Sequence, residues 1–245
     1  MTTRLPALRI PPIAFAHRGA RADAPENTLE AFSLALARGA TGLESDVWIT
    51  ADGVAVLDHD GAIGRWPARR RIAQLSRAEL PDHMPTLEDL YATCGTSFAL
   101  SLDIKDPEAF DQVIAVATAA GDAALDQLWL CHPDWRLVAE WRRVDTVRLV
   151  DSTRLRRIGE GPERRAATLA GAGIDAINLH HADWTGGLAT LFHRFGVTCF
   201  GWDAQLPRVL DELFDLGLDG VYSDHVDRLT EALAKAYPDH SDHSD

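Results

Sequence analysis

The stretch GLESDVWIT, residues 42–50, combines the two features that decide the fold. It is short, contains β-branched and aromatic residues, and ends at the turn signal Ala51-Asp52-Gly53, as a buried β-strand does. Glu44 and Asp46 stand two residues apart in it, so their side chains point to the same face of the strand. Since an unpaired buried carboxylate is costly, the stretch predicts a strand whose acidic face meets a partner.

Similar apolar runs recur along the chain, separated by amphipathic segments. The predicted strands are residues 13–19, 42–50, 98–105, 128–132, 147–151, 176–180, 198–203 and 220–224. The predicted helices are residues 28–38, 108–119, 135–143, 163–172, 187–195, 206–216 and 226–236. Near-continuous apolar strands that alternate with helices predict an α/β fold with a parallel sheet, and eight such units in 245 residues predict a (β/α)8 TIM barrel. An open, doubly wound sheet is the alternative that this pattern leaves.

A short hairpin-like insertion is expected after the second strand. Residues 54–57 are expected to form a returning strand behind the turn at residues 51–53, and residues 65–71 a loop. Pro85 and Thr86 then predict the start of a helix at Leu87. Because no linker divides the chain, residues 1–237 are predicted to form a single barrel domain, and the apolar-poor residues 238–245 a disordered tail.

The composition excludes several classes of protein. With 46% hydrophobic residues and a formal net charge of −13, the chain is globular and lacks the basic excess expected of a nucleic-acid partner. Its three cysteines are far apart in the sequence, which favours a reducing compartment. The sequence shows neither a signal-peptide pattern nor a run of about 20 apolar residues, which predicts a cytoplasmic protein without stable membrane insertion. It leaves the oligomeric state undetermined.

Ionisable residues gather at the ends of the predicted strands, where the loops of such a barrel carry the chemistry. Asp103 shares a strand face with Lys105, as Glu44 does with Asp46. If both faces line the barrel mouth, three carboxylates converge there, and a hard cation such as Mg²⁺ or Ca²⁺ relieves their repulsion. Three separate surface salt bridges are the alternative interpretation.

Histidines supply candidate acid and base groups, because their side chains titrate near neutral pH. His17 ends the first predicted strand, and His59 lies between two aspartates in the insertion. The other histidines near predicted strand ends are His132, His180, His181 and His225. Spacing alone does not select the pair.

Two further groups of polar residues have alternative interpretations. Asn27 either caps the first helix, with Glu30 completing a capping box, or supports the site, and Glu26 is expected to support the histidines. Seven arginines lie in predicted loops, namely Arg65, Arg69, Arg70, Arg71, Arg154, Arg156 and Arg157. They form either a solvated surface or a positive rim that draws a phosphate towards the barrel mouth.

The motifs, in this order, resemble those of the glycerophosphodiester phosphodiesterase family. Within residues 17–60 the matching motifs are His17-Arg18-Gly19, Pro25-Glu26-Asn27-Thr28, Glu44-x-Asp46 and His59-Asp60. Beyond them the matches are Pro85-Thr86-Leu87-Glu88, Leu102-Asp103-Ile104-Lys105, Trp202, Asp219-Gly220 and Ser223-Asp224. The resemblance covers about residues 13–228, and the combination is far more specific than any single motif.

The resemblance implies a TIM-barrel enzyme that hydrolyses glycerophosphodiesters, its small-molecule substrates, to glycerol 3-phosphate and an alcohol. By position, it implies that His17 and His59 are the general acid and base. It also implies that a divalent metal, Mg²⁺ or Ca²⁺, is bound by Glu44, Asp46 and Asp103. Arg18 and Lys105 would contact phosphate oxygens, and Trp202 would form a wall beside the glycerol or the leaving group. The family further implies that the substrate's own glycerol 2-hydroxyl attacks first.

Two departures from the family pattern leave alternatives. Asp103 stands where the family usually has Glu, which shortens the ligand by about 1.5 Å and can alter metal preference. The insertion between Asp60 and Pro85 is short, which can leave the mouth open to other substrates. One alternative is a phospholipase D-type phosphodiesterase acting on lysophospholipids or sphingomyelin-like lipids; its candidate lipid contacts are Trp48, Trp66, Trp184 and Trp202. The other is a catalytically silent, phosphate-binding barrel.

Overall fold

Eight parallel strands close into a barrel in the computed structural model, which describes residues 4–238. The strands are β1 (Ile13–His17), β2 (Gly42–Ile49), β6 (Ala99–Ile104), β7 (Leu128–His132), β8 (Arg148–Ser152), β9 (Ala176–His180), β10 (Thr198–Trp202) and β11 (Gly220–Ser223). β1 pairs with β11 on one side and with β2 on the other, so the sheet has no open edge within the barrel. This closure confirms the (β/α)8 TIM barrel and rules out the open, doubly wound sheet.

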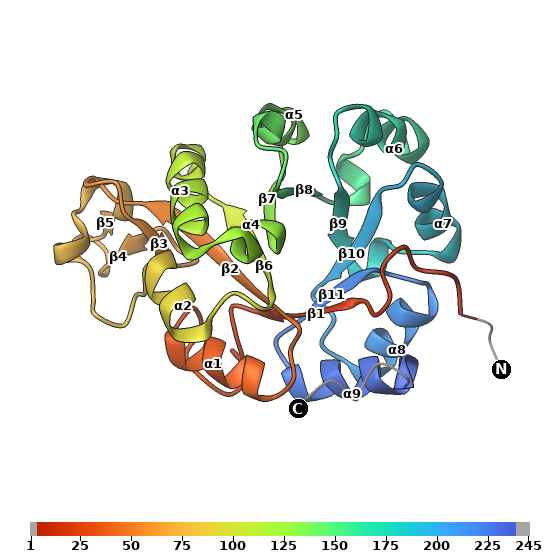
Figure 1. Ribbon diagram of the computed structural model, residues 1–245, viewed down its shortest axis with the longest axis horizontal. Helices are drawn as coiled ribbons and strands as arrows, with labels where there is room; N and C mark the ends of the chain where they lie inside the picture. Colours follow the sequence, from red (N-terminus) through yellow and green to blue (C-terminus); the bar gives the residue numbers. More distant parts are fainter. Residues whose placement is uncertain (1–3, 239–245) are drawn as a thin grey trace.

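Helices follow the strands and cover the outside of the barrel (Figure 1). They are α1 (Leu29–Ala37), α2 (Leu87–Cys94), α3 (Phe110–Ala120), α4 (Asp122–Asp126), α5 (Trp135–Glu140), α6 (Pro162–Gly171), α7 (Gly186–Arg194), α8 (Pro207–Asp215) and α9 (Val226–Ala236). Short 3-10 turns cover Ile72–Gln74, Arg77–Glu79, Pro107–Ala109, Trp141–Arg143, Leu155–Arg157 and His181–Asp183.

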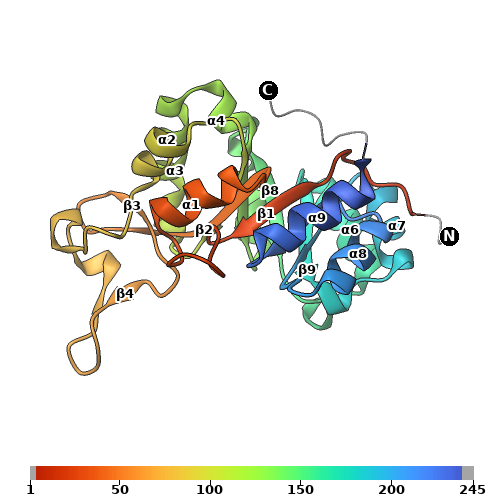
Figure 2. The same cartoon turned by 90° about the horizontal axis from the view of Figure 1, so that it is seen from below.

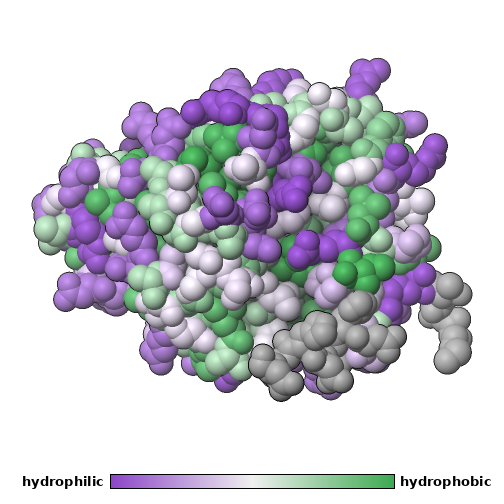
Figure 3. Space-filling view, in the orientation of Figure 1, coloured by the Kyte–Doolittle hydropathy of each residue, from purple (hydrophilic) through white to green (hydrophobic). Residues whose placement is uncertain are grey.

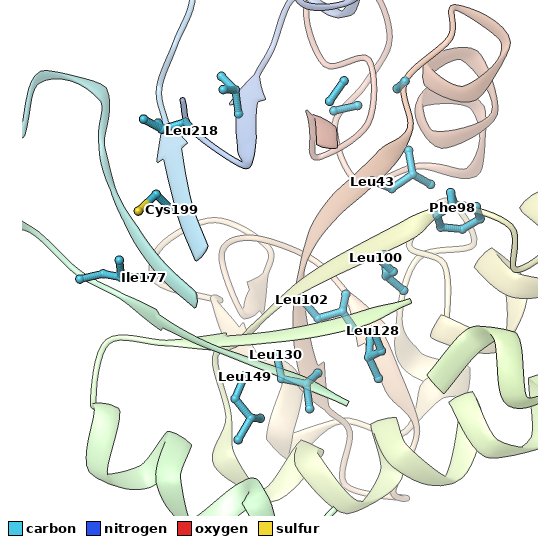
Figure 4. Close-up of a cluster of buried hydrophobic side chains, with 14 of the residues drawn as sticks. Leu43, Phe98, Leu100, Leu102, Leu128, Leu130, Leu149, Ile177, Cys199 and Leu218 are labelled. Carbon is cyan, nitrogen blue, oxygen red and sulfur yellow. The ribbon is translucent and has the colours of Figure 1, made fainter. Parts of the chain in front are cut away.

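Side chains alternate along each strand between the helices and the barrel interior. Leu100 and Leu102 of β6 belong to the apolar layer beneath the helices, together with leucines from the neighbouring strands (Figure 4). The intervening Ser101 and Asp103 face inward and line a cavity. Below that cavity the interior is closed by aromatic rings, with Phe15 stacked on Tyr222 at a centroid distance of 4.4 Å. The polar residues at the strand ends therefore lie above a layer of packed aromatic side chains.

The expected insertion follows β2. β3 (Ala55–Leu57) returns antiparallel to β2, which confirms the predicted hairpin-like strand. The prediction of a loop through residue 71 is wrong at its end, because β5 (Arg70–Arg71) pairs with β4 (Ala62–Ile63) through backbone hydrogen bonds. Figure 2 shows the segment around β4 projecting from the barrel, and hydrophilic side chains dominate this end of the face in Figure 3.

Helix α2 begins where Pro85-Thr86 predicted it. The hydroxyl oxygen of Thr86 accepts a hydrogen bond from the Asp89 backbone, and the Asp89 carboxylate accepts one from the Thr86 backbone. Of the tail expected at residues 238–245, only Pro238 is among the described residues, so that prediction falls outside the described structure. In the part of the chain described, no helix is long and apolar enough to cross a membrane.

Candidate active site

A cavity of about 540 Å³ opens at the carboxyl ends of the barrel strands. Eight of the residues predicted for the site line it: His17, Arg18, Glu44, Asp46, His59, Asp103, Lys105 and Trp202. The remaining lining residues are Ser101, Ser152, Thr153, Arg154, Arg156, Arg157, Asn178, Asp203 and Tyr222. The two other predicted residues, Glu26 and Asn27, lie behind the lining and contact it.

Three carboxylates converge at the ends of β2 and β6. The parallel register sets Asp46 opposite Asp103 and Glu44 opposite Ser101. One oxygen from each of Glu44, Asp46 and Asp103 lies within 4.8 Å of the others. Glu44 and Asp46 are buried, so the three do not form separate surface salt bridges. Burial, reinforced by the charges of Asp46 and Asp103, raises the pKa of Glu44 to about 7.

A divalent cation fits this group. Asp46 Oδ2 is buried and, among the described residues, has no hydrogen-bond partner. A buried carboxylate oxygen that accepts no hydrogen bond, beside two more carboxylates, is the oxygen-rich environment that Mg²⁺ and Ca²⁺ prefer. The shorter Asp103 still brings an oxygen within reach of the other two ligands.

Two cationic side chains adjoin the carboxylates. Lys105 Nζ lies 2.8 Å from Asp46 Oδ1 and 2.9 Å from Asp103 Oδ2. Although burial alone lowers the pKa of Lys105, these two carboxylates outweigh it and raise the pKa. Arg18 donates its backbone N–H to Glu44 Oε2 at 2.9 Å, and its Nε lies 3.4 Å from Asp46 Oδ2. Both residues therefore place a cationic side chain beside the candidate metal group.

His17 is held by Asp224, a residue to which sequence reasoning gave no role. Its Nδ1 lies 2.6 Å from Asp224 Oδ1, and its Nε2 lies 3.8 Å from Glu44 Oε2. Burial lowers the pKa of His17, but the Glu44 charge and the Asp224 hydrogen bond outweigh it and raise the pKa. The available signal was the place of Asp224 directly after the last strand, which closure of the barrel brings beside the first.

His59 approaches the same cavity from the insertion. Its side chain is 43% exposed, and its Nδ1 lies 3.0 Å from Asp60 Oδ1. The other four histidines considered from the sequence are not among the described residues that line the cavity. Of the histidines considered from the sequence, His17 and His59 are thus the two whose side chains line this cavity in the described part of the chain.

Glu26 and Asn27 position residues of the lining. Glu26 Oε1 accepts a hydrogen bond from Arg18 at 3.0 Å, and Asn27 Oδ1 accepts one from Ser45 Oγ at 2.7 Å. The capping interpretation of Asn27 is wrong, because its backbone is left-handed, with φ 54°, and Thr28 caps α1 instead. Asn27 therefore ties the chain before α1 to the outward side of β2, behind Glu44 and Asp46.

The tryptophans proposed as lipid contacts lie in different environments. Trp184 is buried and donates its indole N–H to the Phe200 carbonyl oxygen at 2.9 Å, so it is a core residue. Trp48 packs over Gly61, Trp202 lines the cavity, and Trp66 is 88% exposed in the β4–β5 loop. The arginines divide as well, since Arg154, Arg156 and Arg157 line the cavity and the four from the insertion do not.

The sequence profile of the Glycerophosphoryl diester phosphodiesterase family matches residues 17–228, from His17 through all three carboxylates to the residues after Asp224. The chain belongs to this family. A relative from Mycobacterium tuberculosis, named Probable glycerophosphodiester phosphodiesterase 2, is 29% identical over 263 residues and covers 90% of each chain. Glycerophosphodiester phosphodiesterase 1 of Mus musculus is 40% identical over 98 residues, which are 33% of this chain and 30% of the mouse protein. The match thus spans less than a third of that mammalian relative.

Solved phosphodiesterases share the fold. A glycerophosphodiester phosphodiesterase from Thermotoga maritima has a TM-score of 0.79 at 23% identity, covering 89% of this chain and 97% of that chain. A phosphodiesterase from Oleispira antarctica, solved in complex with the product sn-glycerol-3-phosphate, has a TM-score of 0.78 at 20% identity. That alignment covers 91% of this chain and 96% of the Oleispira chain.

Proposed function

We propose that this chain hydrolyses glycerophosphodiesters to glycerol 3-phosphate and an alcohol, with a divalent cation and two histidines. The observation that carries the proposal is one cavity lined by a cluster of three carboxylates, by the two cationic side chains in contact with that cluster, and by two histidines. Membership of the glycerophosphoryl diester phosphodiesterase family supports the same activity.

Arg18 and Lys105 are suited to bind the phosphodiester. Hydrolysis adds negative charge to the phosphate oxygens, and preorganised positive groups in a partly buried cavity stabilise that charge. Both side chains line the cavity and are fixed by contacts with Asp46. They therefore need little reorganisation when the substrate binds.

We assign the proton transfers to His17 and His59. Because Asp224 engages Nδ1 of His17, Nε2 is the nitrogen left to exchange a proton with the substrate. His59 is exposed at the cavity edge and can exchange its proton with water between turnovers. Trp202 would wall the pocket beside the glycerol or the leaving group.

Glu44, Asp46 and Asp103 would hold the cation, either Mg²⁺ or Ca²⁺, since both prefer carboxylate oxygens. When bound, the cation would neutralise negative charge on the phosphate oxygens. Each carboxylate comes from a rigid strand, which keeps the ligand set in place.

The test is release of glycerol 3-phosphate from glycerophosphocholine and glycerophosphoethanolamine. Protein treated with EDTA is resupplied separately with Mg²⁺, Ca²⁺ and Mn²⁺, and compared with folded His17→Ala and His59→Ala variants. We expect release that a metal restores and that both variants largely lose. Turnover of lysophospholipids alone would replace the proposed substrate class, and binding without turnover under any metal would favour a silent barrel. The cytoplasmic location stays a prediction that cell fractionation tests.

A further inference from the structure

The cavity has an acidic wall and a basic wall. Around the closed barrel, β8 lies four strands from β1 in either direction, so the loop after β8 faces the end of β1 across the mouth. His17 and the three carboxylates come from β1, β2 and β6, and Arg18 directly follows β1. The loop after β8 contributes Arg154, Arg156 and Arg157 to the lining instead. A substrate bound at the carboxylates would thus face arginines across the mouth.

Arg156 and Arg157 are free to bind a ligand. Arg154 Nε lies 2.9 Å from Asp183 Oδ2, which also accepts the Leu155 backbone N–H at 3.1 Å and so fixes the loop. Arg156 and Arg157 are exposed, and within residues 4–238 neither side chain has an ion-pair partner. The chain as a whole repels anions, because it has 37 acidic residues and a net charge of −13. Two unpaired guanidinium groups at the cavity mouth create a local positive potential that attracts anions despite this net charge.

Asp203, an acidic residue of the lining on the same side of the barrel, is already engaged. Asp203 lines the cavity, but its Oδ2 lies 3.2 Å from His180 Nε2 and its Oδ1 accepts a hydrogen bond from Gln205 at 3.3 Å. Arg154 also lies over the Trp202 ring, 5.4 Å from its centroid, which adds positive charge beside that side chain. Positive charge therefore predominates on this wall.

We infer that Arg156 and Arg157 select glycerophosphodiesters whose alcohol part carries an additional anionic group, such as a second phosphate. This inference rests on the proposed function. Since the uncharged glycerol part and the phosphodiester charge are common to all such substrates, only the alcohol part can make these arginines discriminate between them. Guanidinium groups pair with phosphate through two parallel hydrogen bonds, whereas a choline cation is repelled.

Three substrates test the inference. Glycerophosphoinositol 4-phosphate has an anionic alcohol part, glycerophosphoinositol is its neutral match, and glycerophosphocholine is cationic. We expect kcat/KM for the 4-phosphate to exceed that for its neutral match at least tenfold, mainly through KM, and to fall steeply with added salt. The Arg156→Gln/Arg157→Gln variant should lose this preference and gain relative activity on glycerophosphocholine.

Arg164→Gln is the matched control, because Arg164 is exposed on α6 and is not among the described lining residues. It should keep the wild-type preference. Equal rates on the two inositol compounds, or a preference that survives the double substitution, would overturn the inference while leaving the proposed function intact. Calorimetric titration of the full chain with the same compounds, with and without EDTA, measures binding when no compound is turned over. Tight, arginine-dependent binding of the 4-phosphate without turnover of any compound would contradict the proposed hydrolysis and support the anion selectivity.

Discussion

Asp224 determines which nitrogen of His17 faces the cavity. Nδ1 of His17 lies 2.6 Å from Asp224 Oδ1 and donates its proton in a hydrogen bond to that carboxylate. The other ring nitrogen, Nε2, therefore faces the cavity and carries no proton in the neutral imidazole. A negative partner also stabilises the imidazolium that forms when Nε2 takes up a proton. Under the proposed function, Asp224 would therefore act on the reaction through His17 without touching the substrate itself.

Asp224→Asn should lower kcat by about 10- to 100-fold, the usual effect of removing the partner of a functional histidine. The Tm should change little, because Asp224 is partly exposed at the barrel mouth. Asp227→Asn is the control, since Asp227 is exposed at the start of α9. Unchanged kcat in Asp224→Asn, measured with saturating metal, would show that His17 is positioned by other contacts.

Glu44 illustrates the conflict between stability and function at a single residue. It is 6% exposed and lies beside two other carboxylates, so the charge that would bind a cation is costly in its absence. The family motif identifies Glu44 from the sequence, but the energetic cost of its charge can be recognised only once its burial is known.

Glu44→Gln should raise the Tm of EDTA-treated protein at pH 8 while removing the rise in Tm that metal gives the wild type. For a domain of this size each kcal/mol gained corresponds to about 2–4 °C. Thermal unfolding with and without Ca²⁺ measures both effects. Glu231→Gln on α9, an exposed position, should change neither. A variant less stable than wild type in EDTA would contradict the expected repulsion.

At the scale of elements, the insertion after β2 is held to the barrel through Gly61. Its φ is +64°, and a Cβ there would lie 2.3 Å from Trp48 Cζ2 of β2. The contact fixes the loop that carries His59 and Asp60 against the strand that carries Glu44 and Asp46. The position of His59 thus depends on a glycine two residues away.

Gly61→Ala should reduce kcat and lower the free energy of unfolding by about 1–3 kcal/mol beyond the backbone cost, because Trp48 must move. Gly53→Ala is the matched control, since Gly53 has φ +80° but no atom within 4 Å of the added Cβ. It should lose only about 1–2 kcal/mol and retain full activity. Urea unfolding measures the free energy of unfolding of both variants, and a turnover assay measures their kcat. Equal losses in the two variants would show that Trp48 moves aside at no cost.

The elements also show where sequence reasoning ended. The eight strands were predictable because each is a short apolar run, and alternation correctly placed Glu44, Asp46 and Asp103 together. The left-handed backbone at Asn27 could not be predicted in this way, because the Asn27 side chain accepts a hydrogen bond from Ser45, which belongs to a different element. The pairing of Arg70-Arg71 with β4 was missed because two-residue strands carry no periodic signal.

At the scale of the whole molecule, a buried ion pair links strand and helix outside the cavity. Asp151 of β8 has no exposed surface, and its Oδ2 accepts a hydrogen bond from Arg165 of α6 at 2.6 Å. Burial raises the pKa of Asp151 to about 6, and Arg165 offsets this only in part. The folded protein therefore binds a proton here between about pH 4 and 6 that the unfolded chain does not hold.

The contribution of Asp151 to stability is therefore complete below about pH 4 and is lost as the pH rises through about 6. We expect the free energy of unfolding of wild type, minus that of Asp151→Asn, to fall by about 2 kcal/mol from pH 4 to pH 7. Urea unfolding at several pH values measures it, and the subtraction cancels the other titrating groups. A difference independent of pH would show that Arg165 compensates the charge fully.

The contact between His17 and Asp224 was the part of the site that no local pattern could predict. His17 and Asp224 are 207 residues apart in the chain and meet only because β1 pairs with β11. On the ribosome, the carboxylates and His59 are all made within the first 103 residues, long before Asp224 emerges. A nascent chain thus carries the whole candidate metal group without the partner that orients His17. Under the proposed function, full hydrolysis would therefore begin only once β1 has paired with β11, and the onset of full activity during synthesis would report that last folding step.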